Sequence, residues 1–335
     1  MDDAVLRVRD LRTYFFTKSG VVKAVDGISF DLREGETLCL VGESGCGKTV
    51  TALSILGLVD SPPGRTVGGE IWYHQEDLLH SSPERLRAIR GNRIAMIFQD
   101  PQSSLNPIFT VGDQIAEQIR LHRRLGVREA WDLAISQMSQ VGIPQARQRA
   151  GEYPHQFSGG MNQRVLIAAA LSCDPEVLIA DEPTTALDVT IKAQILDILN
   201  RLTEERRMSL LFITHDLGVV AEIADRIVVM YGGRLVEAGT SADIFDNPKH
   251  PYTWGLIKCL PDMSQVQDRL TPIPGMIPSL IDPPQSCIFH PRCPQGMPIC
   301  TQEMPPQITI SGEHTVVCQL YKPPSGTYEK KDPKR

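Results

Sequence analysis

A glycine-rich stretch, GESGCGKT at positions 42–49, has the residue types and spacing that bind a phosphate group. It fits the pattern G-x-x-x-x-G-K-S/T, follows a predicted buried strand and opens a predicted helix. Glycines let backbone N–H groups turn inward around an anion, and the helix N-terminus adds partial positive charge. We therefore expect Lys48 to hold the β- and γ-phosphates of a nucleotide and Thr49 to ligate Mg²⁺. The alternative is a glycine-rich turn without a ligand. The predicted nucleotide-binding residues here are Gly42, Glu43, Ser44, Gly45, Cys46, Gly47, Lys48, Thr49 and Val50.

Two adjacent carboxylates end a second apolar stretch, LIADEP at 178–183. A buried strand that ends in two carboxylates needs a cation or a proton nearby to be tolerable. We expect Asp181 to hold Mg²⁺ through water and Glu182 to orient and deprotonate an attacking water. A solvated acidic turn is the alternative, but the phosphate loop upstream in the same chain favours the catalytic interpretation.

Four of the eight cysteines lie beyond residue 286, separated by five, six and seventeen residues. This is not the paired C-x-x-C spacing of a zinc ribbon. Four thiolates can hold either Zn²⁺ or an iron–sulfur cluster, and a metal could supply about 10 kcal/mol of folding free energy to a proline-rich segment with few apolar residues. The alternative is four free thiols in a loose tail. These cysteines are Cys287, Cys293, Cys300 and Cys318; the isolated Cys39, Cys46, Cys173 and Cys259 are interpreted as ordinary residues.

Strands that alternate with helices must position these groups, which indicates an α/β layered fold. The segments 37–42, 176–181 and 209–216 are predicted to be strands, and apolar residues between 191 and 202 fall on one helical face. The segment 226–239 predicts a hairpin that turns at Gly232 and Gly233. After about residue 245 proline becomes dense and no long periodic element is expected. We place a boundary at 260, between a first domain (1–260) and an extension (261–335) that ends in a basic tail.

Composition excludes several classes of protein. The 335 residues carry a net charge of −6, which does not suggest a surface that wraps nucleic acid. No basic segment followed by an apolar run opens the chain, and the longest apolar stretches are about half of the roughly 20 residues that a membrane helix needs. We therefore expect a cytosolic protein, in which thiols stay reduced and disulfides are not expected.

One further motif points to a family. FSGGMNQR at 157–164 resembles the signature sequence of ABC ATPases, and the family's other motifs surround it in the expected order. Gln99 resembles the Q-loop glutamine, ALD at 186–188 the D-loop, and His215 the switch histidine. The resemblance covers roughly residues 5–250. The chain looks like the ATP-binding subunits of oligopeptide/dipeptide importers in several segments and in its cysteine–proline extension. These segments are MIFQDPQSSLNP, YPHQFSGGM, IADEPTTALDVT and NPKHPYT.

The resemblance implies a fold: an ABC-type P-loop NTPase with a RecA-like core, an antiparallel β subdomain and a helical subdomain at about 100–165. It also implies that Ser158, Gly159 and Gly160 close on the γ-phosphate held by a partner subunit, although Ser158 alone is typical of a helix cap. Met161 replaces the usual signature glutamine and Cys46 stands where serine is frequent.

The same resemblance assigns roles to single side chains. His215 would contact the γ-phosphate, Gln99 the Mg²⁺ and its water, and Asp188 the dimer seam. Each of these is otherwise an ordinary polar residue. Adenine needs an aromatic platform; Phe15 fits best and Tyr14 is second, although a core role for Phe15 is an open alternative.

The implied cofactors are ATP, Mg²⁺ and a 4Fe-4S cluster, with zinc as the alternative. The implied partners are a second ABC ATPase subunit, two transmembrane permease subunits and an extracellular substrate-binding protein; no nucleic acid is expected. Met161 suggests that the second ATPase subunit has a different sequence. The segment 100–110 is a candidate surface for the permease, at the cytoplasmic face of a bacterial or archaeal membrane. Cargo could instead be nickel, glutathione or an oligosaccharide. A soluble ABC ATPase of DNA repair or translation is a rival that the single phosphate loop and the absence of a heptad run disfavour.

Overall fold

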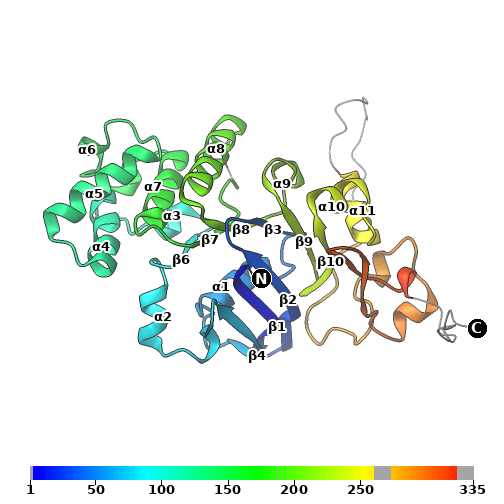
Figure 1. Cartoon of the computed structure of the whole chain (residues 1–335). Helices are drawn as coiled ribbons and strands as arrows, with labels where there is room; N and C mark the ends of the chain where they lie inside the picture. The colour runs from blue at the N-terminus through cyan, green and yellow to red at the C-terminus, as the bar shows by residue number, and fades with distance from the viewer. Residues whose placement is uncertain (1–2, 186, 260–272, 323–335) are drawn as a thin grey trace, which may run out of the picture.

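The computed structural model describes residues 3–185, 187–259 and 273–322, and Figure 1 shows them as two sheets flanked by helices. The first sheet is antiparallel and has the order β2-β1-β4-β5. Leu6, Leu11 and Ile28 lie in its buried face and pack in one apolar cluster with residues of the second sheet. Its strands are β1 (Ala4–Thr17), β2 (Gly20–Arg33), β4 (Gly64–Tyr73) and β5 (Glu76–Asp77).

The second sheet has eight strands in the order β11-β12-β10-β9-β3-β8-β7-β6. Strands β9, β3, β8, β7 and β6 run parallel, so their carboxyl ends meet at one edge. The predicted strands at 37–42, 176–181 and 209–216 are confirmed. The strands are β3 (Thr37–Val41), β6 (Ile94–Ile97), β7 (Val177–Asp181), β8 (Ser209–Thr214), β9 (Arg226–Tyr231), β10 (Arg234–Thr240), β11 (Gln307–Ser311) and β12 (His314–Val317).

Helices connect the parallel strands. The predicted apolar face within 191–202 is confirmed, because Ile195, Leu199 and Leu202 of α8 are buried. The predicted hairpin with its turn at Gly232 and Gly233 is also confirmed, as strands β9 and β10. The helices around the sheets are α1 (Lys48–Ile55), α2 (Pro83–Ile89), α8 (Val189–Arg206), α9 (Leu217–Ile223), α10 (Ser241–Asp246) and α11 (Pro251–Lys258).

A group of helices is inserted between β6 and β7 and lies to one side of the sheets in Figure 1. Ile115 and Ile119 of one helix, Met138 of the next and Val165 of a third are fully buried in a shared core. These helices agree with the predicted helical pattern. They are α3 (Pro101–Ser104), α4 (Val111–Arg123), α5 (Val127–Gln140), α6 (Ala146–Arg149) and α7 (Gly159–Leu171).

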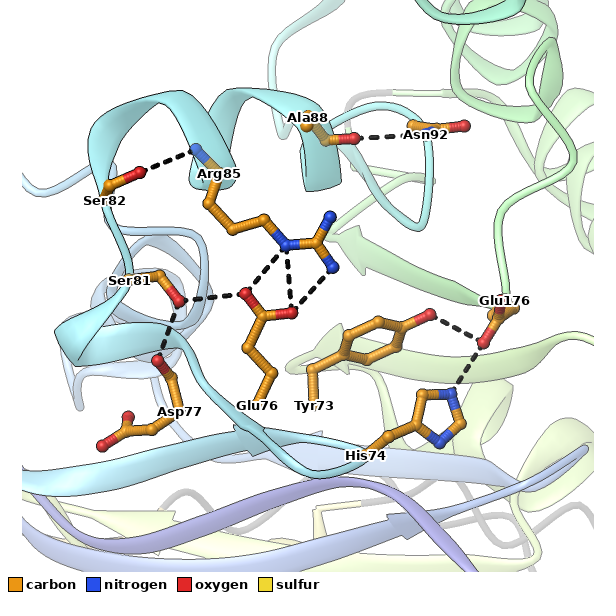
Figure 2. A network of polar contacts seen from close by, with 10 residues as sticks. All are labelled: Tyr73, His74, Glu76, Asp77, Ser81, Ser82, Arg85, Ala88, Asn92 and Glu176. Atoms are coloured by element: carbon orange, nitrogen blue, oxygen red, sulfur yellow. Dashed lines mark hydrogen bonds and ion pairs between the residues drawn. The ribbon is translucent and has the colours of Figure 1, made fainter.

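Glu176, the residue before β7, joins the two sheets (Figure 2). Its carboxylate accepts a hydrogen bond from the hydroxyl of Tyr73, the last residue of β4, at 2.6 Å and lies 2.8 Å from Nε2 of His74, the next residue. Arg93 Nη1 donates to the other oxygen at 2.8 Å. These contacts fix the amino end of β7, whose carboxyl end carries Asp181.

The described part of the extension, residues 273–322, lies beside β10, α10 and α11 in Figure 1. It consists of short 3-10 turns and the hairpin β11–β12, which the sequence did not predict. Strand β12 pairs with β10, and His314 Nε2 lies 2.8 Å from the Glu237 carboxylate, both side chains being fully buried. The extension is thus the edge of the main sheet. The predicted boundary at 260 and the predicted basic tail beyond 322 lie outside the described residues.

Candidate functional site

The predicted phosphate loop lies between β3 and α1, where residues 42–47 form the turn and Lys48, Thr49 and Val50 the first turn of the helix. Gly47 has φ 108°, and a Cβ there would lie 2.1 Å from the Ala24 carbonyl oxygen. Gly45 also has positive φ, at 78°. Only glycine suits such a backbone, which turns the chain tightly and exposes the N-terminus of α1.

Lys48 lies at the centre of this loop. Its side chain is buried, and Nζ donates to the carbonyl oxygens of Gly42 at 2.8 Å and Glu43 at 3.1 Å. An ammonium group held across the loop by backbone oxygens is placed to meet an anion bound by the loop's N–H groups. The geometry therefore agrees with the predicted role of this lysine.

Asp181 ends β7 at the same edge of the sheet, and 1% of its surface is exposed. Burial raises its pKa to about 6, a hydrogen bond from Thr49 opposes that rise, and Oδ1 has no hydrogen-bond partner. A buried carboxylate oxygen without a partner is unfavourable unless a cation or proton occupies it. Because Mg²⁺ prefers hard oxygen ligands, Asp181 and Thr49 fit the predicted ion.

Glu182 follows Asp181 with φ 46°, a conformation that few non-glycine residues adopt. Three side chains hold its carboxylate: Gln99 Nε2 donates to Oε2 at 3.1 Å, Thr185 Oγ1 donates to Oε2 at 2.9 Å, and His215 Nδ1 lies 3.0 Å from Oε1. Burial alone would raise the pKa of Glu182, but the hydrogen bonds from His215 and Thr185 hold it below its usual value. Glu182 is therefore ionised at neutral pH, as a general base must be. The structure brings together Gln99, Glu182 and His215, the three side chains predicted to be catalytic.

Sequence reasoning missed two supports of this group. Thr185 carries no signal of its own, although it lies in the turn that follows the two carboxylates. Lys192 of α8 forms an ion pair with Asp216, which follows His215 and caps α9 by accepting from Gly218 N–H at 2.9 Å. The backbone beside His215 is thus fixed from α8.

The predicted signature residues lie in the inserted helices. Ser158 is the N-cap of α7 and accepts from Met161 N–H at 3.4 Å, and Gly159 and Gly160 form the first turn. A Cβ on Gly160 would lie 2.6 Å from Ile191 of α8. Asp188 caps α8 and accepts from Ile191 N–H at 2.9 Å. The starts of α7 and α8 are therefore neighbours, and both caps hold hydrogen bonds within their own helices.

The two candidate aromatic platforms differ in their contacts. Tyr14 donates its hydroxyl to Asp26 Oδ1 at 2.6 Å, and its pKa is raised mainly by burial. Phe15 is half-buried; a Cβ on Gly64 would come within 2.8 Å of its ring, so the ring packs on the segment after α1. The Tyr14 hydroxyl is therefore already bonded to the Asp26 carboxylate, whereas the Phe15 side chain has no polar group that needs a partner.

The four cysteines of the extension share one neighbourhood. Cys287 N–H donates to the Cys300 carbonyl oxygen at 3.0 Å. Burial raises the pKa of the Cys318 thiol to about 11, and the charges of the three other thiols add to the rise. Within the described ranges, however, no group of three or more His, Cys, Asp or Glu side chains is arranged to hold a metal ion. As positioned, the thiols are neighbours without forming a ligand set. Cys39, Cys46 and Cys173 are buried singly elsewhere.

None of the helices in the described ranges combines the length and apolar character needed to cross a lipid bilayer.

Comparison with known proteins follows the two parts of the chain. A family model described as "ABC transporter" matches residues 25–185, and one described as "Oligopeptide/dipeptide transporter, C-terminal region" matches residues 236–300. The chain is 49% identical to the dipeptide transport ATP-binding protein DppD of Bacillus subtilis, over 95% of each chain. It is 48% identical to the oligopeptide transport ATP-binding protein AppD of Bacillus subtilis, over 95% of this chain and 97% of that one.

Solved structures confirm the predicted fold. The bacterial ABC transporter cassette MJ0796, solved as a dimer, superposes with a TM-score of 0.63 at 26% identity. The match covers 70% of this chain and 98% of that cassette, and MJ0796 was also solved in a post-hydrolysis state bound to ADP and phosphate. The α/β fold with its helical insertion is therefore that of an ABC ATPase.

Proposed function

The chain belongs to the ABC transporter ATP-binding proteins of the oligopeptide/dipeptide type, and from this membership we propose that it hydrolyses ATP to drive the import of di- or oligopeptides. The observation that carries the proposal is the group around Glu182. An ionised carboxylate, held by Gln99, Thr185 and His215, stands next to the partnerless Oδ1 of Asp181 at the sheet edge that carries the phosphate loop.

In this proposal each residue of the site has one role. Lys48 and the backbone N–H groups of the loop bind the β- and γ-phosphates. Thr49 and Asp181 hold Mg²⁺, which when bound neutralises phosphate charge. Water attacks the γ-phosphorus while its proton passes to Glu182, and the bond to the β–γ bridging oxygen breaks to give ADP and phosphate. His215 and Gln99 keep Glu182 oriented toward that water, His215 also contacts the γ-phosphate, and Phe15 stacks on adenine.

A second ATPase subunit completes the site. The exposed cap of α7, with Ser158, Gly159 and Gly160, carries unpaired backbone N–H groups and therefore attracts an anion. Because α7 belongs to the inserted helices, which lie to one side of the sheets (Figure 1), we propose that its N-terminus binds the γ-phosphate held by the partner, while Asp188 lies at the seam. Met161 in the signature favours a partner with a different sequence, hence a heterodimer with unequal sites.

The remaining partners follow from the transport role. We propose that the pair of ATPases docks on two transmembrane permease subunits at the cytoplasmic face of the membrane, with cargo delivered by an extracellular substrate-binding protein. The exposed Ile108 and Phe109, which follow α3 within the segment 100–110, support docking of a permease helix there.

The cysteines of the extension are proposed to hold a 4Fe-4S cluster, with one Zn²⁺ as the alternative. Support comes from the shared neighbourhood of the four thiols; the thiols must draw together to bind, so metal would order the segment. Iron, acid-labile sulfide and zinc should be measured on protein purified without oxygen. About four irons and four sulfides per chain, lost in Cys293→Ser, would support the cluster. About one zinc per chain would support a zinc site instead, and no metal would indicate that the four thiols are free.

Transport is tested by uptake in a strain that lacks the gene, with labelled dipeptide and with competing peptide, nickel, glutathione or oligosaccharide. Restored peptide uptake, competed only by peptides, supports the proposal, whereas competition by another solute would reassign the cargo. Affinity purification of the chain should recover permease subunits. Recovery of ribosomes or DNA ends instead would favour the soluble ABC ATPases of translation or DNA repair.

A further inference from the structure

One contact joins the extension directly to the phosphate loop. Glu43, the second residue of that loop, accepts two hydrogen bonds from Arg292, which lies in the 3-10 turn His290–Arg292 of the extension. Arg292 Nη1 donates to Oε2 at 2.6 Å and Nη2 to Oε1 at 2.9 Å. A paired, two-bond contact between guanidinium and carboxylate fixes both distance and orientation.

Arg292 is enclosed as well as paired. Only 4% of its side chain is exposed. Nε donates to the Pro274 carbonyl oxygen at 3.0 Å, Nη2 to that of Ile273 at 3.2 Å, and Nη1 lies 3.4 Å from the Tyr231 hydroxyl. Removing Glu43 would leave the buried Arg292 guanidinium without its charged partner, and removing Arg292 would free the partly buried Glu43 carboxylate, so the positions of the two side chains depend on each other.

The backbone of Glu43 is held from both sides. Its N–H donates to the Tyr252 hydroxyl of α11 at 2.8 Å, and Tyr252 packs against Phe289 of the extension with ring centroids 5.5 Å apart. Its carbonyl oxygen accepts from Lys48 Nζ at 3.1 Å. Side chain, N–H and carbonyl oxygen of one loop residue are thus bound, and the last of these bonds is to the predicted phosphate-binding lysine.

We propose that Arg292 is a positioning residue for the phosphate loop: by holding Glu43 it fixes the loop conformation that binds ATP, so that the extension sets the nucleotide affinity of this subunit. The inference rests on the proposed ATP-binding function. Since Arg292 acts through Glu43 on ground-state binding, its loss should change ATP affinity while leaving the hydrolysis step nearly intact.

The test uses the full chain and measures the Kd for ATP, the KM and kcat of hydrolysis, and the melting temperature. Arg292→Ala should raise Kd and KM about tenfold, within the usual range of coupling between sites, and change kcat less than about twofold. Arg292→Lys, which keeps the charge but not the fork, should recover part of the affinity. The double variant Glu43→Gln/Arg292→Ala should bind ATP no more weakly than whichever single variant binds it more weakly, because each substitution removes the same contact.

Glu313→Gln is the matched control. Glu313 also pairs the extension with the core, through Arg33 and Arg226, but near the start of β3 rather than at its phosphate-loop end. The Kd of the Glu313→Gln protein for ATP should stay within about twofold of the wild-type value. An Arg292→Ala protein that melts earlier but binds ATP with the same Kd would overturn the proposal and leave Arg292 as an anchor only. If the Arg292→Ala protein does not fold, an unchanged Kd for ATP in Glu43→Gln would also overturn the proposal. Lys48→Ala tests the proposed function separately, since retained ATP binding there would refute the site itself.

Discussion

The nucleotide site and the extension are built in different ways. In the proposed nucleotide site, regular elements position the side chains: Thr49 lies in the first turn of α1, Asp181 ends β7 and His215 follows β8. In the extension, short turns and one hairpin join the core through the pairing of β12 with β10 and the buried Ile288 and Phe289, and buried polar pairs add to these contacts. The pairs Glu237–His314 and Glu43–Arg292 are the clearest of these contacts.

From this difference we expect substitutions in the two regions to affect different properties, either the chemistry or the stability of the fold. A sheet edge keeps its geometry when a side chain at its end is altered, so variants there should lose chemistry and keep their fold. A segment of short turns that also depends on buried polar pairs shifts locally when one pair is removed, so variants there should change stability or the loop that the segment touches. The following predictions test that contrast, beginning with the largest expected effect.

Glu182→Gln should lower the rate of ATP hydrolysis by about 10²–10⁴-fold, because an amide cannot accept the proton of the attacking water. ATP binding should remain, since Lys48 and the loop are untouched, and the melting temperature should change little. Phosphate release and ATP titration measure the two effects. Hydrolysis at the wild-type rate would remove Glu182 as the base.

Glu237→Ala should lower the free energy of unfolding by about 3–5 kcal/mol. The buried carboxylate accepts from Lys249 N–H at 2.6 Å and from His250 N–H at 2.8 Å besides meeting His314, and all three groups lose their partner. Denaturant unfolding measures the loss, and kcat at low temperature should stay near that of the wild type. A large fall in kcat without a loss of stability would contradict the contrast between the two regions.

Asp181→Asn, measured without Mg²⁺, should raise stability at pH 8 by about 2–3 kcal/mol. The pKa of Asp181 is raised to about 6 by burial, so the wild type is destabilised as pH rises from the unfolded value near 3.8 through 6. Below pH 3.8 the carboxyl is protonated in both states and the two proteins should be equally stable. Unfolding curves at pH 3.5 and 8 test this; a gain of stability at pH 3.5 alone would reverse the sign and refute the burial argument.

Phe15→Ala should weaken ATP binding roughly fivefold, which corresponds to about 1 kcal/mol of ring stacking. Tyr14→Phe, which loses only the hydrogen bond to Asp26, should bind ATP as the wild type does. Fluorescence titration with ATP compares them. Unchanged ATP binding in Phe15→Ala would remove Phe15 as the adenine platform.

Much of the proposed nucleotide site could be predicted because local patterns determine where its residues lie. A strand, a glycine turn and a helix place Lys48 and Thr49, and an apolar strand that ends in two carboxylates places Asp181 and Glu182. Joining Gln99 and His215 to Glu182 required the resemblance, since the three residues are far apart in sequence and the first two are ordinary alone.

The contacts of the extension could not be predicted in the same way. Arg292 lies among prolines without periodicity, and nothing in its neighbourhood indicates that it meets Glu43 across the fold. The hairpin β11–β12 has short strands, one of which is stabilised by pairing with β10, a contact that only the tertiary structure supplies. The ion pair of Lys192 and Asp216 is hidden for the same reason.

The strand order also has a consequence for how the chain is made. Strand β3, which leads into the phosphate loop, ends at residue 41, but its two neighbours are β8 at 209–214 and β9 at 226–231. A ribosome adds about 5–20 residues per second, so the nascent strand waits on the order of ten seconds with both edges unpaired. The ATP site therefore forms late in translation, and a nascent chain stopped before residue 209 should carry the whole phosphate-loop sequence and bind no nucleotide.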